Sequence, residues 1–445
     1  MQVSIIGTGY VGLVSGVCFA DKGHQVVCVD IDPNKVEKIN QGFSPFYEPG
    51  LDELLERNIH SRLKATTDFR QAILDTDVSL IAVGTPFDGR EVDLTYVKQV
   101  AQQIGEALKD KSTYHLVIVK STVVPGTTDQ VVLPILEAAS GKKAGVDFGV
   151  GMNPEFLTEG EAISDFMYPD RIVLGGIDDR SIDLLDQLYE GFDGVDRLRT
   201  NNSTAEMIKY TSNSLLALLI SFSNEIGNLC AAIGNTDIVE VMQGVHNSRY
   251  LTTVMPNGDR IVPPITSFLA AGCGFGGSCL PKDVKALIAH GEKYGSPMPL
   301  LDAVIQVNQA QPKQVIARLH KHFPSLEGVR VAILGLSFRP NTNDMRESPA
   351  IPIVRDLLAQ KAILKAYDPV ANAEAQHILG ADALEYCDSL NQVLEGVQAV
   401  VLVTRWDEFR SVPELLTKLD PQPVFVDGRR LLDQHSIAKY EGIGL

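Results

Sequence analysis

Near its start the chain reads Val3-Ser-Ile-Ile-Gly-Thr-Gly-Tyr-Val-Gly12, and these residues indicate the fold of the first half of the chain. The β-branched residues before Gly7 predict a short buried strand, and a helix-like stretch over residues 13–22 follows the last glycine. Gly7 allows a tight turn, Gly9 lets the backbone approach a pyrophosphate, and Gly12 lets the helix pack closely on the strand. The spacing therefore predicts a strand–turn–helix unit that binds a dinucleotide.

A carboxylate stands where such a unit needs one. Asp30 ends the expected second strand, residues 25–30, and lies 18 residues after Gly12. It can accept hydrogen bonds from the ribose hydroxyls of adenosine and would repel a 2′-phosphate, so NAD is favoured over NADP, although Lys35 could soften the repulsion. The helix N-terminus offers N–H groups and a positive dipole end to the phosphates. We expect the turn to contact NAD through Gly7, Gly9, Tyr10, Val11 and Gly12.

Two further strand ends carry small polar residues. Val83-Gly-Thr-Pro86 ends one expected strand, and Ser121-Thr122-Val123 ends the next. In a parallel α/β sheet, ligands bind at the carboxyl ends of the strands. We therefore expect contacts to the cofactor or to the reacting hydroxyl from Thr85, Pro86, Ser121 and Thr122.

The rest of the chain divides by its pattern of apolar residues. Residues 1–195 alternate short β-branched runs with helix-length segments, which is typical of a parallel doubly wound sheet. Residues 203–235 keep the helical spacing of apolar residues and predict one long helix, either buried in the centre of the chain or shared with a second subunit, with Ser203 as N-cap and Glu206 three residues on. Residues 236–265 read as a loop.

From Val329 the strand–helix pattern restarts. The predicted fold class is α/β, with two Rossmann-like doubly wound domains joined by a central helical domain that contains the long helix. We predict the domains as residues 1–200, which bind NAD, residues 201–312, which are helical, and residues 313–445, which are Rossmann-like.

Composition limits the partners of the chain. Its 445 residues are 44% hydrophobic and 21% charged, the ordinary balance of a soluble globular protein. A net charge of −17 argues against a nucleic-acid partner. The first residues enter a strand at once, and no apolar run approaches the roughly 20 residues that span a bilayer, so we expect a cytoplasmic protein with no membrane partner. The six cysteines form no Cys-x-x-Cys pair, so we expect no metal site.

The segment Gly274-Phe-Gly-Gly-Ser-Cys-Leu-Pro-Lys-Asp283 combines several chemical features. Its three glycines let backbone N–H groups come close to an anionic or carbonyl oxygen. Cys279 lies just before Pro281 and the helix expected near Lys282, and a cysteine beside a helix N-terminus and a lysine can have a lowered pKa. The segment therefore predicts a nucleophilic thiolate, with Asp283 placed to accept a proton or orient a water.

At this point the chain resembles the nucleotide-sugar dehydrogenase family over essentially its whole length, and most of all its UDP-glucose 6-dehydrogenase branch. The resemblance rests on six motifs that occur in the family's order. Besides the glycine turn and the Cys279 segment, they are Asn153-Pro-Glu-Phe-Leu-Thr-Glu-Gly160, Glu206-Met-Ile-Lys-Tyr-Thr-Ser-Asn213, Phe338-Arg-Pro-Asn-Thr-Asn-Asp-Met-Arg-Glu-Ser348 and Asp427-Gly-Arg-Arg430.

The resemblance implies a four-electron oxidation of a sugar C6 alcohol to the carboxylate, with UDP-glucose and two NAD as the default substrates. Cys279 would attack the aldehyde that the first hydride transfer produces and form a thiohemiacetal. The second hydride transfer would leave a thioester, which water would cleave. The covalent adduct would prevent loss of the free aldehyde.

The resemblance also assigns roles around the cysteine. Lys209 and Asn213 lie four residues apart, so they share one face of a helix, and they would together hold the developing oxyanion. Asp283 would assist a water or orient Lys209 and Cys279. Dimerisation through the long helix of residues 203–235 is expected from its apolarity and from the family.

In the motif of residues 153–160, Glu155 would act as general base together with Thr122 through a water, and Glu159 would lie near the cofactor. Arg346 would also approach the cofactor. The substrate contacts that the resemblance implies are Glu155, Phe156, Leu157, Glu159, Lys209, Asn213, Arg260, Phe268, Leu269, Gly274, Phe275, Gly276, Phe338, Arg339 and Arg429.

The chain departs from the family pattern in two places. Arg339 replaces the usual lysine, which keeps the charge and adds a planar fork suited to phosphate. The interval from Lys209 to Cys279 is longer than usual, with the extra residues around 248–264. Family members often take an arginine from the partner subunit here, and both Arg249 and Arg260 are candidates. Arg429 and Arg430 are likewise alternatives for one substrate cation.

Other functions stay open at this point. Within the same chemistry, GDP-mannose or another nucleotide sugar could replace UDP-glucose. A two-electron β-hydroxyacid dehydrogenase shares the first domain and a Lys/Asn pair, but it needs neither Cys279 nor a third domain. A dinucleotide sensor without catalysis would not need the Cys, Lys, Asn and Asp set. The number of NADH formed per substrate separates these alternatives.

Overall fold

Strand β1 lies inside an eight-stranded sheet and pairs in parallel with β2 and β4. Its residues from Val3 to Ile6 are buried, as expected for a β-branched run that is covered on both faces. The strand order is β3-β2-β1-β4-β5-β6-β7-β8. The strands are β1 (Gln2–Ile6), β2 (Gln25–Val29), β3 (Leu63–Thr66), β4 (Val78–Ile81), β5 (His115–Val119), β6 (Phe148–Met152), β7 (Arg171–Gly176) and β8 (Asp196–Thr200).

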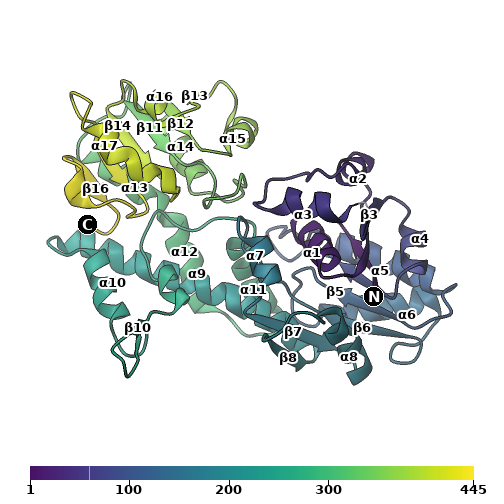
Figure 1. Ribbon diagram of the computed structural model, residues 1–445. Helices are drawn as coiled ribbons and strands as arrows, with labels where there is room; N and C mark the ends of the chain where they lie inside the picture. Colours follow the sequence, from purple (N-terminus) through teal and green to yellow (C-terminus); the bar gives the residue numbers. More distant parts are fainter. Residues whose placement is uncertain (60) are drawn as a thin grey trace. The chain divides into compact units, whose positions relative to one another are not determined.

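Helices cover both faces of this sheet (Figure 1). One apolar layer contains side chains of α1 (Tyr10–Asp21), α3 (Leu51–Asn58), α7 (Ala162–Met167) and α8 (Asp179–Leu188). The other contains side chains of α4 (Phe69–Leu74), α5 (Thr95–Leu108) and α6 (Leu133–Ser140). The helices α2 (Pro33–Asn40) and η1 (Thr128–Val132) complete this part of the chain.

Strands β7 and β8 run in the opposite direction to the other six strands, whereas the sequence pattern indicates a parallel sheet. Strands β1 to β6 are parallel, but β7 runs antiparallel to β6, with Gly151 opposite Gly176. The connection between them, residues 153–170, contains only the short helix α7, so the chain turns back at the edge where β6 ends. The loop with the motif of residues 153–160 therefore begins and ends at the carboxyl edge of the sheet.

The computed structural model describes residues 1–59 and 61–445, which form two compact units, Met1–Ser212 and Asn213–Leu445. Helix α9 (Asn202–Ile233) runs through the boundary between the units. The predicted domain limits at residues 200 and 312 stay a prediction.

Helix α9 begins one residue earlier than predicted. Asn201, and not Ser203, provides the capping side chain, because its Oδ1 accepts a hydrogen bond from Thr204 N at 2.8 Å. Among the described helices α9 is also the one long and apolar enough to cross a membrane, with a mean hydropathy of 1.5 over 18 residues. Length and apolarity do not distinguish such a span from a core helix of a soluble protein.

The segment predicted as a loop, residues 236–265, contains a helix and a hairpin. Asp237 accepts a hydrogen bond from Val239 N at 2.9 Å and so caps α10 (Ile238–His246). The hairpin strands β9 (Thr253–Val254) and β10 (Arg260–Ile261) project beyond α10 (Figure 1). The turn η2 (Pro264–Phe268) and the helices α11 (Leu280–Lys293), α12 (Pro299–Ala310) and α13 (Pro312–His320) come next along the chain.

The C-terminal sheet has six strands, all parallel, in the order β13-β12-β11-β14-β15-β16. Helices cover it as they cover the first sheet, so the predicted fold class is confirmed. The strands are β11 (Arg330–Leu334), β12 (Ile363–Tyr367), β13 (Glu385–Tyr386), β14 (Ala399–Leu402), β15 (Val424–Asp427) and β16 (Tyr440–Gly442). The helices are α14 (Ala350–Ala359), α15 (Asn372–Leu379), α16 (Leu390–Leu394) and α17 (Val412–Leu416), with the short turns η3 (Asp407–Ser411) and η4 (Gln434–Ser436).

Candidate functional site

The glycine turn is built as the spacing predicts. Gly7 has φ +99°, and a Cβ on it would lie 2.8 Å from the carbonyl oxygen of Ala82. A Cβ on Gly12 would lie 1.9 Å from the carbonyl oxygen of Gly7, so a side chain there would force the turn open. Around Gly9, in contrast, a Cβ would meet no protein atom within 4 Å. The open space lies at the N-cap of α1, beside helix N–H groups of the kind that bind phosphates.

Asp30 follows β2 and faces this turn. Its carboxylate accepts hydrogen bonds from Thr8 N at 2.9 Å, from the Thr8 hydroxyl and from Asp32 N at 3.0 Å. Partial burial raises the pKa of Asp30, but these hydrogen bonds and the charge of Lys35 outweigh burial and hold the pKa below its usual range. A half-buried, ionised carboxylate therefore faces the turn, and the charge of Lys35 contributes to its ionisation.

The polar residues after β4 and β5 are joined to one another. The Thr85 hydroxyl donates to Thr122 O at 2.8 Å, and the Ser121 hydroxyl donates to Val83 O at 2.7 Å. These bonds hold the two strand ends side by side at the carboxyl edge. Contacts from Thr85, Ser121 and Thr122 to a ligand stay a prediction.

The motif of residues 153–160 brings Glu155 to Lys209. Lys209 Nζ lies 2.9 Å from Glu155 Oε1, and the two side chains are only 4% and 6% exposed. Glu155 also accepts a hydrogen bond from Leu157 N at 2.7 Å. Burial raises the pKa of Glu155, but the charge and hydrogen bond of Lys209 outweigh it, and the net pKa is below its usual range. A carboxylate with a lowered pKa is a weak base, so this geometry favours Glu155 as the partner that orients Lys209.

An aromatic ring lies beside this pair. The guanidinium carbon of Arg171 lies 3.9 Å from the centre of the Phe156 ring, and Lys209 Nζ lies 5.5 Å from it. Cations over an aromatic face are attracted by the ring. Phe156, which we predicted to contact the substrate, thus helps to hold the cations on this side of α9.

Sequence reasoning missed Glu48, which ties the glycine turn to the same loop. Gly160 N and Ala162 N each donate to the Glu48 carboxylate at 2.7 Å, and the Tyr10 hydroxyl donates to it as well. Glu48 is only 6% exposed. Tyr10, predicted as a cofactor contact, therefore uses its hydroxyl to connect the glycine turn to the loop. Glu48 follows Tyr47 and precedes Pro49-Gly50, which reads as an ordinary turn.

Glu206 has a different role from the one we predicted for a capping-box residue. Its carboxylate accepts hydrogen bonds from Gly126 N at 2.6 Å and from Thr128 N and the Thr128 hydroxyl at 2.8 and 2.6 Å. Burial is the largest influence and raises the pKa of Glu206 to about 7 in spite of these donors. The residue fixes the first turns of α9, one turn before Lys209, to the segment that follows Ser121 and Thr122.

In the second unit, the glycines of the Cys279 segment allow close contact with the loop after β11. A Cβ on Gly276 would lie 2.3 Å from Glu347 O, and one on Gly277 would lie 2.7 Å from the Phe338 ring. Gly277 N also donates to Arg346 O at 2.8 Å. The two predicted substrate segments are thus in direct contact, with Phe338 packed on the cysteine loop.

Cys279 is the N-cap residue of α11 and the one partly exposed cysteine among the six; the other five are buried. Helix α11 begins at Leu280, two residues before the expected start, with Pro281 in its first turn. The Cys279 Sγ lies 3.6 Å from the Ser278 hydroxyl. The helix N-terminus favours negative charge on the sulfur.

Asp283 lies one turn further along α11 and is 1% exposed. It accepts a hydrogen bond from Asn213 Nδ2 at 2.6 Å, and Lys282 Nζ lies 2.6 Å from its other oxygen. Asp283 therefore fixes the amide of Asn213, a residue four positions after Lys209 on α9. The prediction that Asp283 assists a water stays a prediction.

The two candidate arginines after β15 are not equivalent. Arg430 makes a forked ion pair with Asp237, at 2.8 and 2.7 Å, and its side chain is 7% exposed. Arg429 is half-buried and donates to Gly274 O at 2.7 Å and to Val403 O. Because Arg429 reaches the cysteine loop and Arg430 is held by Asp237, the geometry favours Arg429.

The remaining predicted contacts are spread more widely. Arg346 makes a forked pair with Asp344, at 2.6 Å for the shortest contact. Arg260 is exposed on β10 and donates to Asn247 at 2.9 Å. Leu269 is buried in the apolar core of its unit, whereas Phe268 is half-buried. Of these, Leu269 is least accessible to a sugar.

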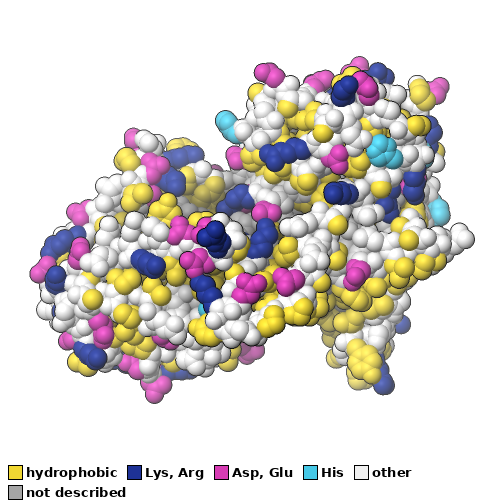
Figure 2. Space-filling view, turned by 180° about the vertical axis from the view of Figure 1, so that it is seen from behind, with side chains coloured by type: hydrophobic (Ala, Val, Ile, Leu, Met, Phe, Trp, Pro, Cys, Tyr) yellow, Lys and Arg dark blue, Asp and Glu magenta, His cyan; other side chains and the backbone are white. Residues whose placement is uncertain are grey.

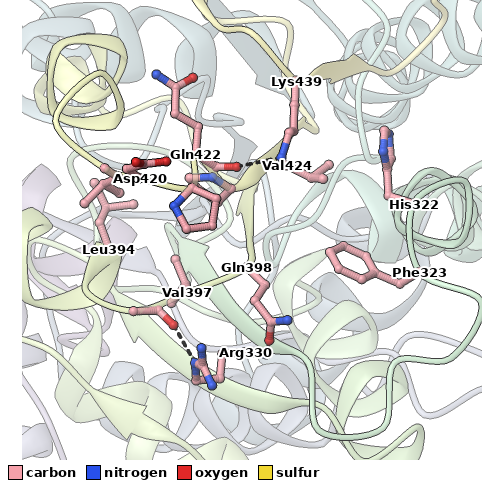
Figure 3. Close-up of a pocket in the computed structure, with 14 residues that line it drawn as sticks. His322, Phe323, Arg330, Leu394, Val397, Gln398, Asp420, Gln422, Val424 and Lys439 are labelled. Atoms are coloured by element: carbon pink, nitrogen blue, oxygen red, sulfur yellow. Dashed lines mark hydrogen bonds between the residues drawn. The ribbon is translucent and has the colours of Figure 1, made fainter.

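A cavity of about 430 Å³ lies elsewhere in the second unit (Figure 3). It opens beside the amino ends of β11, β14 and β15, the sheet edge opposite to Phe338. Two of its cations are already bound to backbone, since Arg330 donates to Gly396 O and Lys439 to Gln422 O at 3.1 Å. None of the 14 lining residues belongs to the predicted site. Among residues 1–59 and 61–445, no group of His, Cys, Asp or Glu is arranged to hold a metal.

The chain matches known proteins along almost all of its length. Family models of the UDP-glucose/GDP-mannose dehydrogenase family match residues 1–193 (NAD binding domain), 203–310 (central domain) and 332–434 (UDP binding domain). The UDP-glucose 6-dehydrogenase of Haloferax volcanii is 40% identical over 450 residues, which cover all of both chains.

Two solved structures extend the likeness to the backbone. A UDP-glucose dehydrogenase from Pyrobaculum islandicum is 38% identical, with a TM-score of 0.90 over 99% of this chain and 97% of that one. A GDP-mannose dehydrogenase from Pseudomonas aeruginosa is 37% identical, with a TM-score of 0.55 over all of both chains. The predicted NAD cofactor and the predicted resemblance are confirmed. The chain belongs to the UDP-glucose/GDP-mannose dehydrogenase family, whose members oxidise nucleotide sugars with NAD.

Proposed function

We propose that this NAD-dependent nucleotide-sugar 6-dehydrogenase converts UDP-glucose to UDP-glucuronate in a four-electron oxidation through Cys279. The observation that carries the proposal is the placement of this sulfur. Cys279 is partly exposed at the N-terminus of α11, in a loop whose glycines leave no room for other side chains. A two-electron alcohol oxidation needs no such thiolate.

The chemistry follows from this placement. Bound NAD supplies the hydride acceptor for each of two oxidations. After the first, the C6 alcohol is an aldehyde, and the Cys279 sulfur adds to its carbon while the carbonyl oxygen takes up charge. Loss of the second hydride from that carbon leaves a thioester, and attack by water breaks the C–S bond to give the acid and the free thiol. Holding the carbon covalently keeps the aldehyde from diffusing away.

The oxyanion needs donors that are fixed before the reaction. Asp283 binds one N–H of the Asn213 amide at 2.6 Å, which leaves the second N–H in a defined direction. Glu155 holds Lys209 Nζ at 2.9 Å in the same way. Both proposed oxyanion ligands on α9 are thus oriented by a buried carboxylate, so little reorganisation is required when charge develops.

The nucleotide is the finer part of the proposal. The match to the UDP-glucose 6-dehydrogenase of Haloferax volcanii, which extends over all of both chains, supports UDP-glucose. We propose that Arg339 and Arg429 bind the diphosphate of the substrate. Arg339 lies in the loop after β11, and Arg429 donates a hydrogen bond to Gly274 O in the Cys279 segment. GDP-mannose is the competing substrate. Initial rates with a panel of nucleotide sugars at equal concentration decide between them.

The test of the mechanism is stoichiometry. The wild-type protein should form two NADH per UDP-glucose, whereas one NADH would indicate a two-electron enzyme and none would exclude catalysis on this substrate. Cys279→Ser should lose net acid formation by about 1,000-fold or more, because a serine hydroxyl is a poor nucleophile without an activating base, and should still bind NAD. Cys230→Ala, a buried cysteine in the same unit, is the matched control and should retain turnover. Normal acid formation by Cys279→Ser would contradict the covalent route.

We also propose a homodimer through α9. Leu215, Phe222, Leu229 and Ile233 recur on one face of this helix and are 44–65% exposed. The hairpin nearby projects from the molecule with a largely hydrophobic surface (Figure 2). An apolar face of this kind in a soluble enzyme indicates an interface.

The oligomeric state tests this proposal directly. Leu229→Glu should shift the mass measured by light scattering from dimer to monomer, because it places a charge on the apolar face. Val146→Glu is the control, since Val146 is 66% exposed and lies in the loop between α6 and β6, which is not part of the proposed interface, and its mutant should stay dimeric. A monomeric wild-type protein at micromolar concentration would contradict the proposal.

A further inference from the structure

Lys120 is a buried cation to which sequence reasoning gave no role. It follows β5 directly, and its residue is 2% exposed. Nζ donates to Asn153 Oδ1 at 2.9 Å and lies 3.4 Å from Asn153 O. Burial, together with the positive charge of Lys209, lowers the pKa of Lys120 to about 8, although the negative charge of Glu155 opposes the shift. A buried ammonium is costly to maintain, so its position calls for an explanation.

The partner of Lys120 is an asparagine whose side-chain oxygen and nitrogen both form hydrogen bonds. Asn153 Oδ1 accepts from Lys120 Nζ and from the Tyr189 hydroxyl, at 2.9 and 2.5 Å. Asn153 Nδ2 donates to Val173 O on β7 at 2.9 Å, and its backbone N donates to Val119 O. Three segments of the unit therefore hold this one side chain, at the point where β6 ends and the loop with Glu155 begins.

The loop that begins at Asn153 connects this hydrogen-bonded side chain to the Lys209 ammonium. Glu155 comes two residues after Asn153, accepts a hydrogen bond from Leu157 N, and binds Lys209 Nζ at 2.9 Å. The positive charge of Lys120 also acts on Glu155 and favours its ionised form. One buried carboxylate is thus flanked by two lysines, of which one anchors the loop and the other faces the proposed oxyanion.

We propose that Lys120 is a positioning residue: through Asn153 and through its own charge it fixes the Glu155–Lys209 pair, and with it the ammonium that meets the developing oxyanion. The inference rests on the proposed function of Lys209. It predicts that Lys120 affects the rate of hydride transfer and not the binding of either ligand, because the Lys120 side chain is buried in protein and acts through the Glu155–Lys209 pair.

The test replaces Lys120 by methionine, which keeps the length and apolar stem of the side chain and removes its charge and donor. Lys120→Met should lower kcat by about 10- to 100-fold, with KM for the nucleotide sugar changed by about threefold or less and two NADH still formed per substrate. Lys111→Met is the matched control. Lys111 is a second buried lysine in the same unit, but it binds the carbonyl oxygens of Ile73, Leu74 and Thr76, so its loss should lower stability and leave kcat unchanged.

A double mutant separates positioning from general damage. If Lys120 acts through Lys209, adding Lys120→Met to Lys209→Met should slow the enzyme no further, because interacting residues are not additive. Additive losses, or a Lys120→Met enzyme with wild-type kcat, would overturn the inference while leaving the proposed function intact. Failure of the wild-type protein to oxidise any nucleotide sugar would instead reject the proposed function. NAD binding and the thermal midpoint of Lys120→Met show whether the variant is folded.

Discussion

Both sheets of this protein place a glycine with positive φ after their first strand and a carboxylate after their second. Gly7 follows β1 with φ +99°, and Gly335 follows β11 with φ +89°. Asp30 follows β2 and Asp368 follows β12, and each accepts hydrogen bonds from the residues next to the glycine of its own sheet. The same local arrangement of a glycine and a carboxylate therefore occurs twice in the chain.

The sheets differ in the length of chain between the glycine and the next helix. In the first, α1 begins at Tyr10, so the helix N-terminus lies directly at the strand end. In the second, α14 begins only at Ala350, and the intervening loop carries Phe338 and Arg339. A helix N-terminus binds phosphate with backbone N–H groups, whereas a long loop can bring cationic and aromatic side chains. We propose that the same turn serves two kinds of ligand binding, depending on the length of chain between the glycine and the next helix.

The two carboxylates differ as well. Asp30 is half-buried and is held by residues of the glycine turn. Asp368 is 2% exposed, and its Oδ2 accepts hydrogen bonds from Leu336 N, from Ser337 and from the Trp406 indole, while backbone N–H groups donate to its Oδ1. Asp30 is therefore available to a ligand, and Asp368 is part of the internal structure of its sheet.

The largest effect is expected at the glycine with the least room. Gly12→Ala places a Cβ 1.9 Å from Gly7 O, so the turn must open. NAD affinity should fall by about 100-fold or more, because the phosphates lose the aligned N–H groups of α1. Isothermal titration with NAD measures this. An unchanged affinity would show that NAD does not bind through the glycine turn and the N-terminus of α1.

Replacement of the buried carboxylate should act on stability alone. Asp368→Ala leaves several buried N–H groups without an acceptor, and we expect the free energy of unfolding to fall by about 3 kcal/mol. NAD affinity should not change. Urea denaturation followed by fluorescence measures the free energy of unfolding, and titration measures the NAD affinity. An Asp368→Ala protein as stable as the wild type would show that Asp368 and Asp30 do not differ in their structural role.

Asp30→Ala should change the cofactor preference and leave the stability almost unchanged. Loss of the carboxylate removes both the ribose acceptor and the repulsion of a 2′-phosphate, so the ratio of kcat/KM for NAD to that for NADP should fall by about 10- to 100-fold. Stability should change by less than about 1 kcal/mol, because the site is only half-buried. A preserved cofactor preference would refute the ribose contact.

The smallest effect is expected for Gly9→Ala. A Cβ there meets no protein atom within 4 Å, and φ is −70°, so the fold should tolerate alanine with an unchanged thermal midpoint. The added methyl group can meet only a ligand, and NAD affinity should fall by about 10-fold. Equal affinities for wild type and mutant would place the pyrophosphate elsewhere.

Local pattern was enough to predict the strand–turn–helix of residues 3–12, the long α9 and the helix start beside Cys279, because each depends on neighbours in sequence. It could not predict the direction of β7, since an antiparallel and a parallel strand bury the same residues.

Long-range pairing explains the other omissions. Glu48 and Gly160 are 112 residues apart, and Glu206 and Gly126 are 80 apart, so no spacing rule connects them. Lys120 had no signal of its own, because a lysine that follows a strand is usually solvated. The partners of a buried charge are known only once the chain is folded.

The reversed direction of β7 has a consequence for ligand binding. Because the chain turns back at the carboxyl edge, the loop from Asn153 to Gly160 is closed at both ends and is held there by Lys120 and by Glu48. A loop that is already ordered loses little conformational entropy when a ligand arrives. If the substrate binds this loop, as we propose, more of the interaction then remains for affinity and for the reaction itself.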